Sequence, residues 1–216
     1  MTTDIHELAA RARGLLAHRD RAVLGITGVP GAGKTTLVEL LLAALRAAPP
    51  EGTHGEDWVA HVPMDGFHLA DVQLDRLGLR HRKGAPETFD AAGYHCTLTR
   101  ILENDGAEPV YAPGFERELE QPVAAAIAVT PEARLILTEG NYLLMDEGAW
   151  PRVRATMAEV WYVDLPDQVR RDRLVDRHVR FGKAPDAARE WVHRSDEANA
   201  VLVSRLRSSA DLVVTL

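Results

Sequence analysis

A glycine-rich stretch from Gly28 to Thr35 has the residue types and the spacing of a phosphate-binding loop. It reads Gly-Val-Pro-Gly-Ala-Gly-Lys-Thr and fits the pattern G-x-x-x-x-G-K-[ST]. Glycines let successive backbone N–H groups turn toward one anion, and a helix starting at the loop adds the positive end of its dipole. Lys34 offers a mobile cation to the β- and γ-phosphates of a nucleotide, and Thr35 offers a hydroxyl to Mg²⁺. The residues predicted to bind the nucleotide are Gly28, Gly31, Ala32, Gly33, Lys34, Thr35 and Thr36.

The segments on either side of this loop are those that the motif requires. The apolar run 23–27 predicts a buried strand, and the leucines of 36–45 recur at helical spacing. The alternative is a glycine turn that only joins a strand to a helix. Because strand, loop and helix come in the required order, phosphate binding is the favoured interpretation.

Two carboxylates follow predicted strands and are expected to share an edge of the sheet with the loop. Asp65 follows the segment 58–64, and Glu139 follows the apolar segment 135–138. Asp65 could accept the proton of an alcohol that attacks the γ-phosphorus. Glu139 could orient Mg²⁺, directly or through water, or contact the substrate. The structural alternatives are a turn-forming aspartate and a strand-end acid that faces solvent.

A basic helix predicted over 166–181 could close over the phosphates. Helical spacing puts Arg170, Arg173 and Arg177 near one face, while Arg177 and Arg180 lie near the end that Gly182 marks. The alternative is a solvated helix whose arginines pair with acids of the same helix. Arg177 and Arg180 are the favoured phosphate contacts, with Arg177 also assigned a catalytic role.

The polar stretch 66–90 is predicted to be irregular, and loops of this length in compact domains are usually functional or mobile. Its basic turn contains Lys83, which could hold an anionic substrate or be solvated. His68 lies close to Asp65 in the sequence and is a candidate substrate contact, with a surface histidine as the alternative.

Composition limits the class of protein. The 216 residues suffice for one sizeable domain, and acids exceed bases by 32 to 25, which disfavours general nucleic-acid binding. The single cysteine excludes an internal disulfide and suits a reducing cytoplasm. The first residues lack the features of a signal peptide, and no apolar run is long enough to span a bilayer. We therefore expect a cytoplasmic protein with neither a membrane nor a nucleic-acid partner.

Strands and helices alternate along the chain, which indicates an α/β domain with a mainly parallel sheet and helices on both faces. Further strands are predicted at 160–164 and 212–216, with short ones at 110–111 and 124–129 around a loop. One domain, 1–216, is expected. Its predicted parts are an N-terminal helix within 1–20, substrate-side loops and a helix within 66–122, and a lid within 166–190.

Taken together, the motifs are identified as those of a known family. The chain resembles the phosphoribulokinase, uridine kinase and pantothenate kinase family of P-loop kinases. The pieces that carry the resemblance are the loop Gly28–Thr36, Met64-Asp65-Gly66-Phe67-His68, Glu139-Gly140-Asn141-Tyr142-Leu143-Leu144 and Arg177-His178-Val179-Arg180-Phe181-Gly182. The segment 83–90 is similar to that of a bacterial subgroup described as nucleoside kinase-like or fructokinase-like.

The resemblance implies a P-loop NTPase-type fold with an arginine-bearing lid, and it implies ATP and Mg²⁺ as cofactors. Asp65 would be the catalytic base, and Glu139 the second acid near Mg²⁺ and substrate. Lys34 and Arg177 would complete the catalytic set, and Arg117 and Tyr142 would lie near the substrate. Uridine kinases carry a Tyr-Asp-Phe…His-x-Arg segment, and the corresponding stretch 111–117 has the Tyr and Arg without the Asp and His.

The leading hypothesis is an ATP-dependent kinase that phosphorylates a hydroxyl of a small metabolite, a sugar or nucleoside first and a pantothenate-like acid next. A nucleoside monophosphate kinase and an ATP-binding regulator without chemistry are the alternatives. A GTPase switch is disfavoured because the guanine motif N-K-x-D is missing. A homodimer is left open.

Overall fold

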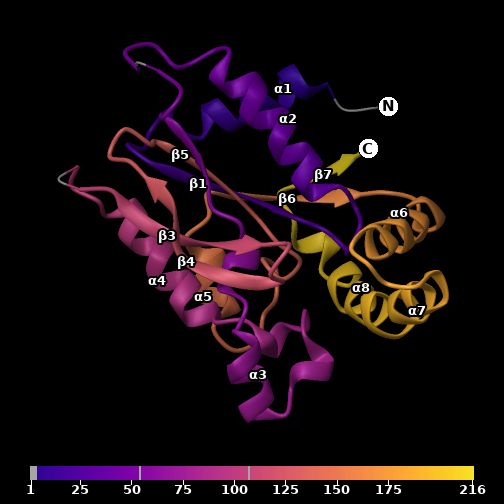
Figure 1. The fold of residues 1–216 in the computed structure, drawn as a ribbon. Coiled ribbons are helices and arrows are strands. Elements are labelled where there is room, and N and C mark those ends of the chain that lie inside the picture. The colour runs from indigo at the N-terminus through magenta and orange to yellow at the C-terminus, as the bar shows by residue number, and fades with distance from the viewer. Residues whose placement is uncertain (1–3, 54, 107) are drawn as a thin grey trace.

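The computed structural model of the chain describes residues 4–53, 55–106 and 108–216, so residues 1–3 of the predicted N-terminal helix region lie outside it. A sheet of five parallel strands forms the centre (Figure 1). In spatial order the strands are β2 (Val59–His61), β5 (Leu135–Glu139), β1 (Ala22–Thr27), β6 (Glu159–Asp164) and β7 (Leu212–Thr215).

Helices cover both faces of this sheet. The helices α1 (Ile5–Gly14) and α2 (Lys34–Arg46) lie on one face, and α4 (Ala91–Leu102) and α5 (Trp150–Ala155) lie on the other (Figure 1). Every residue of β1 and β5 is buried, as expected of parallel strands that are covered on both sides. The predicted α/β fold is confirmed.

A third group of helices stands at the β6–β7 end of the sheet (Figure 1). It consists of α6 (Asp167–Arg180), α7 (Pro185–Trp191), a π-helical segment Val192–Asp196 and α8 (Glu197–Ser204). The π-helical segment joins α7 directly to α8. Such segments are rare and often lie at functional sites.

The prediction of an irregular stretch over 66–90 is wrong. The structure has a 3₁₀ helix at Met64–Phe67, the helix α3 (Asp71–Leu77) and two short 3₁₀ turns, Arg80–Arg82 and Pro86–Thr88. Leu74 is the one buried residue of α3, so the helix carries almost no apolar periodicity that sequence analysis could detect. It ends at Gly78, whose φ of 68° suits a left-handed helix cap.

Two other boundaries also differ from the predictions. The strands β3 (Val110–Glu116) and β4 (Gln121–Val129) form an antiparallel hairpin, so most of the predicted loop between them is strand. Pro113 and Gly114 suggested a loop, but a shift of register between Ala112 and Gly114 accommodates them. The strand predicted at 58–64 is shorter because the 3₁₀ helix starts at Met64. Among the described residues, no helix has the length and apolarity to cross a membrane.

Candidate active site

The glycine-rich loop connects β1 to α2 and is pressed between the sheet and α6. Gly31 and Gly33 have φ angles of 79° and 93°, which a side chain would strain. A Cβ on Gly31 would lie 2.7 Å from Leu174 Cγ, and one on Gly33 would lie 3.6 Å from Arg173 Nη1. The glycines thus let α6 pack against the loop, and this contact brings Arg173 beside it.

Lys34 is buried at the start of α2, with its side chain 9 % exposed. Its Nζ donates to the carbonyls of Gly28 at 3.1 Å and Val29 at 3.2 Å, and to Asn141 Oδ1 at 2.7 Å. Burial lowers the pKa of Lys34 to about 8, although Glu139 and Asp65 act to raise it. The ammonium is therefore charged at neutral pH but close to losing its proton.

Glu139 is the last residue of β5 and faces Thr35 across the start of α2. Thr35 Oγ1 donates to Glu139 Oε1 at 3.2 Å, and the carboxyl residue is only 7 % exposed. Burial raises the pKa of Glu139, as does the charge of Asp65, while Lys34 opposes the rise. A hydroxyl and a carboxylate are the hard oxygen donors that Mg²⁺ takes in small number beside phosphates and waters. This pair therefore fits the predicted magnesium site.

Asp65 lies in the 3₁₀ helix that follows β2. Arg117 of the β3–β4 hairpin donates from Nη2 to Asp65 Oδ2 at 2.8 Å, and both side chains keep contact with solvent. A Cβ on Gly66 would lie 2.2 Å from the carbonyl oxygen of Pro113. The glycine therefore lets the hairpin rest directly on the turn that holds Asp65, and this close approach places Arg117 at the carboxylate.

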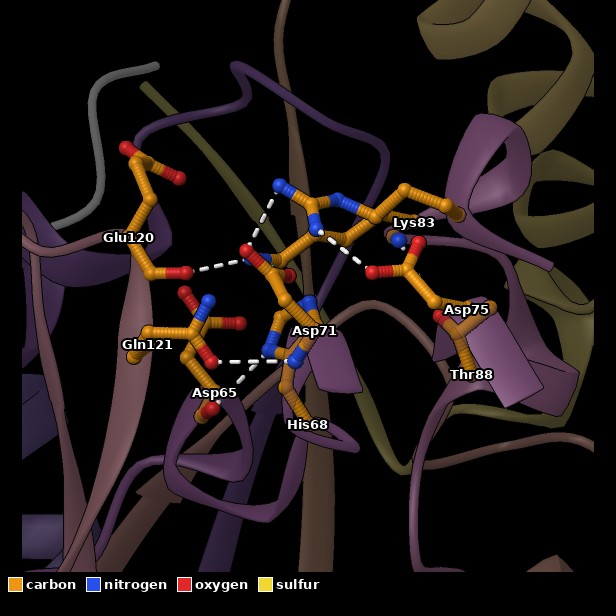
Figure 2. A network of polar contacts seen from close by, with 10 residues as sticks. Asp65, His68, Asp71, Asp75, Lys83, Thr88, Glu120 and Gln121 are labelled. Carbon is orange, nitrogen blue, oxygen red and sulfur yellow. Dashed lines mark hydrogen bonds and ion pairs between the residues drawn. The ribbon is translucent and has the colours of Figure 1, made fainter. Parts of the chain in front are cut away.

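A network of polar contacts joins the 66–90 stretch to the turn of the hairpin (Figure 2). Lys83 Nζ donates to Asp71 Oδ1 at 2.7 Å and to the carbonyl of Glu120, while Gln121 accepts from the backbone N–H of Asp71 at 3.0 Å. Arg80 pairs with the second oxygen of Asp71 at 2.7 Å. The basic turn is therefore neutralised within its own neighbourhood.

His68 contacts the backbone of Asp65 and lies in an aromatic cluster with Phe89 and Phe115. Its Nδ1 lies 2.9 Å from the carbonyl oxygen of Asp65, and its ring centroid lies 3.9 Å from that of Phe89 and 5.0 Å from that of Phe115. Burial lowers the pKa of His68, so the imidazole is neutral at pH 7. Two cations lie over the ring of Phe115: Arg117 Cζ is 5.1 Å and Lys83 Nζ is 5.7 Å from the ring centroid.

The arginines of α6 differ in burial and in the residues that they contact. Arg170 is buried and pairs with Asp167 at 3.3 Å and with Glu197, so it holds α6 to α8. Arg173 lies beside Gly33, and Arg177 is close enough to Lys34 to lower its pKa. Arg180 is exposed in the last turn of the helix.

Known proteins of similar sequence include one from Schizosaccharomyces pombe, named "Putative uridine kinase C227.14". It is 33 % identical over 214 residues, which cover 96 % of this chain and 88 % of that protein. A second relative, "ATP-dependent kinase YFH7" of Lachancea thermotolerans, is 28 % identical over 90 % of this chain and 65 % of its own length. No protein-family profile matches the chain.

A solved structure is also closely similar. It is described as a "putative fructose transport system kinase" from Silicibacter sp. TM1040, with a TM-score of 0.85 at 36 % identity over 98 % of both chains. This chain belongs to the uridine kinase-related family of P-loop kinases. The similarity to the Schizosaccharomyces pombe protein and to this solved structure extends over almost the whole of this chain.

The structure of the kinase brings most of the predicted site residues together. Thr35 hydrogen-bonds Glu139, the charge of Asp65 acts on both Lys34 and Glu139, and the charge of Arg177 acts on Lys34.

Two predicted substrate contacts have other partners. Tyr142 is fully buried and its hydroxyl donates to the carbonyl of Gly84, so it cannot touch the acceptor in this conformation. Lys83 is held by Asp71 and Glu120. Both residues hold the 66–90 stretch in place.

Sequence analysis gave no role to Asn141 and left Arg173 undecided. Asn141 was visible only as part of the Glu-Gly-Asn motif, because its contact with Lys34 spans 107 positions of sequence. Arg173 shares a helical face with Arg177, but helical spacing alone could not show that this face meets Gly33.

Proposed function

We propose that this kinase transfers the γ-phosphoryl group of ATP–Mg²⁺ to a hydroxyl group of a small metabolite, a sugar or nucleoside. The observation that carries the proposal is the position of Asp65: it follows β2, which pairs with the strand β5 that ends at Glu139, and its charge acts on the pKa of both Lys34 and Glu139. An acid in that position can hold an acceptor hydroxyl in line with the γ-phosphorus.

In this mechanism the loop amides, Lys34 and the N-terminus of α2 bind the β- and γ-phosphates. Thr35 and, directly or through water, Glu139 would hold Mg²⁺, which would supply positive charge to neutralise the phosphates. Asp65 accepts the proton of the acceptor hydroxyl. The hydroxyl oxygen bonds to the γ-phosphorus while the bond between that phosphorus and ADP breaks.

The arginines of α6 take the charge that spreads over the transferred group. Arg177 and Arg180 belong to the lid that we propose, and Arg173 joins them because it already lies beside Gly33. Lid closure would bring the exposed Arg180 toward the phosphates.

The acceptor side favours a neutral, hydroxyl-rich molecule. Arg117 is paired with Asp65, and Lys83 and Arg80 are paired with Asp71, so each of these cations already has a carboxylate partner. Hydroxyl groups can share hydrogen bonds with such pairs, whereas an acidic acceptor would have to displace one of the carboxylates. This balance supports a sugar or nucleoside over a pantothenate-like acid.

The test is ADP release from ATP–Mg²⁺ with a panel of sugars, nucleosides, pantothenate and nucleoside monophosphates. We expect ADP release to rise with a neutral hydroxyl compound. A response to nucleoside monophosphates alone would contradict the proposal, and so would ATP binding without turnover for any acceptor.

A further inference from the structure

Asn141 makes the shortest of the three hydrogen bonds of the Lys34 ammonium. Its Oδ1 lies 2.7 Å from Nζ, against 3.1 and 3.2 Å for the carbonyls of Gly28 and Val29. An ammonium group has three protons, so these three acceptors occupy all of them. A phosphate oxygen can bind Lys34 only by replacing one of the three.

The bond to Asn141 is the one that a phosphate would replace. Gly28 and Val29 belong to the loop that wraps the phosphates, so their carbonyls stay beside the ammonium when the site fills. Asn141 instead comes from the segment after β5. Its amide oxygen therefore occupies the place at the ammonium that a phosphate oxygen would take as the third acceptor.

The position of Asn141 is fixed by its backbone. Its carbonyl accepts from Thr27 Oγ1 at 3.1 Å, and the N–H of Gly140 donates to the carbonyl of Ile26 at 3.0 Å. A Cβ on Gly140 would lie 2.5 Å from Met64, so this segment packs closely on the turn that holds Asp65. Release from Lys34 would free the Asn141 side chain while its backbone stays in place.

A second set of contacts leads from Asn141 toward the acceptor side. Its side chain lies close to that of Tyr142, the next residue, whose hydroxyl donates to the carbonyl of Gly84. Asn199 of α8 approaches the same carbonyl at 3.4 Å. The N–H of Gly84 in turn donates to Thr88 Oγ1 at 3.0 Å. One chain of polar contacts thus runs from the phosphate-binding loop to the segment 83–88.

We propose that Asn141 is a positioning residue that holds Lys34 ready for the phosphates and transmits phosphate binding to the segment 83–88 through Tyr142. The inference rests on the ATP binding proposed above, but it needs no particular acceptor. Occupation of the phosphate site frees the Asn141 amide, changes its contact with Tyr142 and so alters how firmly Gly84 is held. The nucleotide would thereby prepare the acceptor side.

Hydrogen–deuterium exchange of the segment 83–90, with and without ATP–Mg²⁺, tests this inference. In the wild-type protein we expect ATP to change the exchange rate of these amides several-fold. Asn141→Ala should bind ATP within about threefold of wild type, because the phosphates replace the lost bond, yet should lose the change in exchange. Tyr142→Phe should also lose it, since the link to Gly84 is cut.

Matched controls are Asn104→Ala, in the loop after α4, and Tyr111→Phe, whose ring is exposed on the hairpin. Both should keep the wild-type response. If ATP binds to the wild-type protein without changing exchange at 83–90, or if Asn141→Ala or Tyr142→Phe responds as wild type does, the relay is wrong while the kinase proposal stands. Failure of the wild-type protein to bind ATP would overturn both.

Discussion

Lys34 is a buried cation whose charge depends on the pH of the solution. Burial lowers its pKa to about 8, so the ammonium is present below that pH and lost above it. Because the phosphates need the charged form, kcat/KM for ATP should be flat below about pH 8 and should then fall, approaching tenfold per pH unit. A pH–rate profile measures this, and constant kcat/KM up to pH 9.5 would contradict it.

Arg117 reaches Asp65 from the hairpin, and its role is expected to concern the acceptor. Arg117→Ala should lower kcat/KM for the acceptor by about 10- to 100-fold, because the carboxylate loses the group that orients it. KM for ATP should stay within about twofold, since the hydrogen bond and the ring contact of Arg117 in the described structure go to Asp65 and Phe115 and not to the loop. Steady-state kinetics with each substrate varied in turn separates the two effects. Equal loss for ATP and acceptor would show that Arg117 does more than orient Asp65.

The packing of α6 on the phosphate-binding loop is a property of elements rather than of single residues. Gly31→Ala combines a φ of 79° with a Cβ placed 2.7 Å from Leu174, so we expect a loss of about 1–3 kcal/mol in the free energy of unfolding and weaker ATP binding. Gly148→Ala is the control, because its φ is 59° but nothing lies within 4 Å. It should cost at most about 1 kcal/mol. Denaturant unfolding measures the free energy of unfolding of both variants and so separates the steric clash at Gly31 from the backbone strain that both positions share. Equal losses of stability would mean that α6 does not press on the loop.

Sequence analysis succeeded at this scale where a pattern is strong. The strand, glycine loop and α2 were predicted because a buried strand and an amphipathic helix flank a fixed motif. α3 was missed because it buries a single leucine, and the hairpin was underpredicted because Pro113 and Gly114 imitate a loop. The ion pair between Asp65 and Arg117 was beyond sequence analysis, since it depends on how the hairpin rests on Gly66.

At the scale of the whole molecule, the sequence predicted a parallel sheet but not the order β2-β5-β1-β6-β7. Alternating strands and helices fix the class of fold, whereas the order of strands depends on which connections cross the sheet. That order puts β5 beside β1, and this adjacency brings Glu139 and Asn141 to the loop.

The edge strand β2 makes the stability of the molecule sensitive to acid. Burial lowers the pKa of His61 to about 4 from 6.5. As the pH falls, His61 therefore gains its proton at a higher pH in the unfolded chain than in the folded protein. The stability linked to neutral His61 is present above pH 6.5 and is lost progressively down to about pH 4, by up to about 3 kcal/mol. His61→Gln cannot take up this proton, so its unfolding free energy should vary less over that range. Parallel pH profiles for wild type and variant would contradict the assignment.

The central claim is that Asp65 performs chemistry in a site whose nucleotide is held by other groups. Phosphoryl transfer to the acceptor found in the panel and the affinity for ATP should therefore be measured side by side for the wild-type protein and Asp65→Asn. We predict that the variant loses about 10²- to 10⁴-fold in transfer rate while its ATP affinity stays within a few-fold of wild type. A variant that transfers phosphate at nearly the wild-type rate would contradict the account.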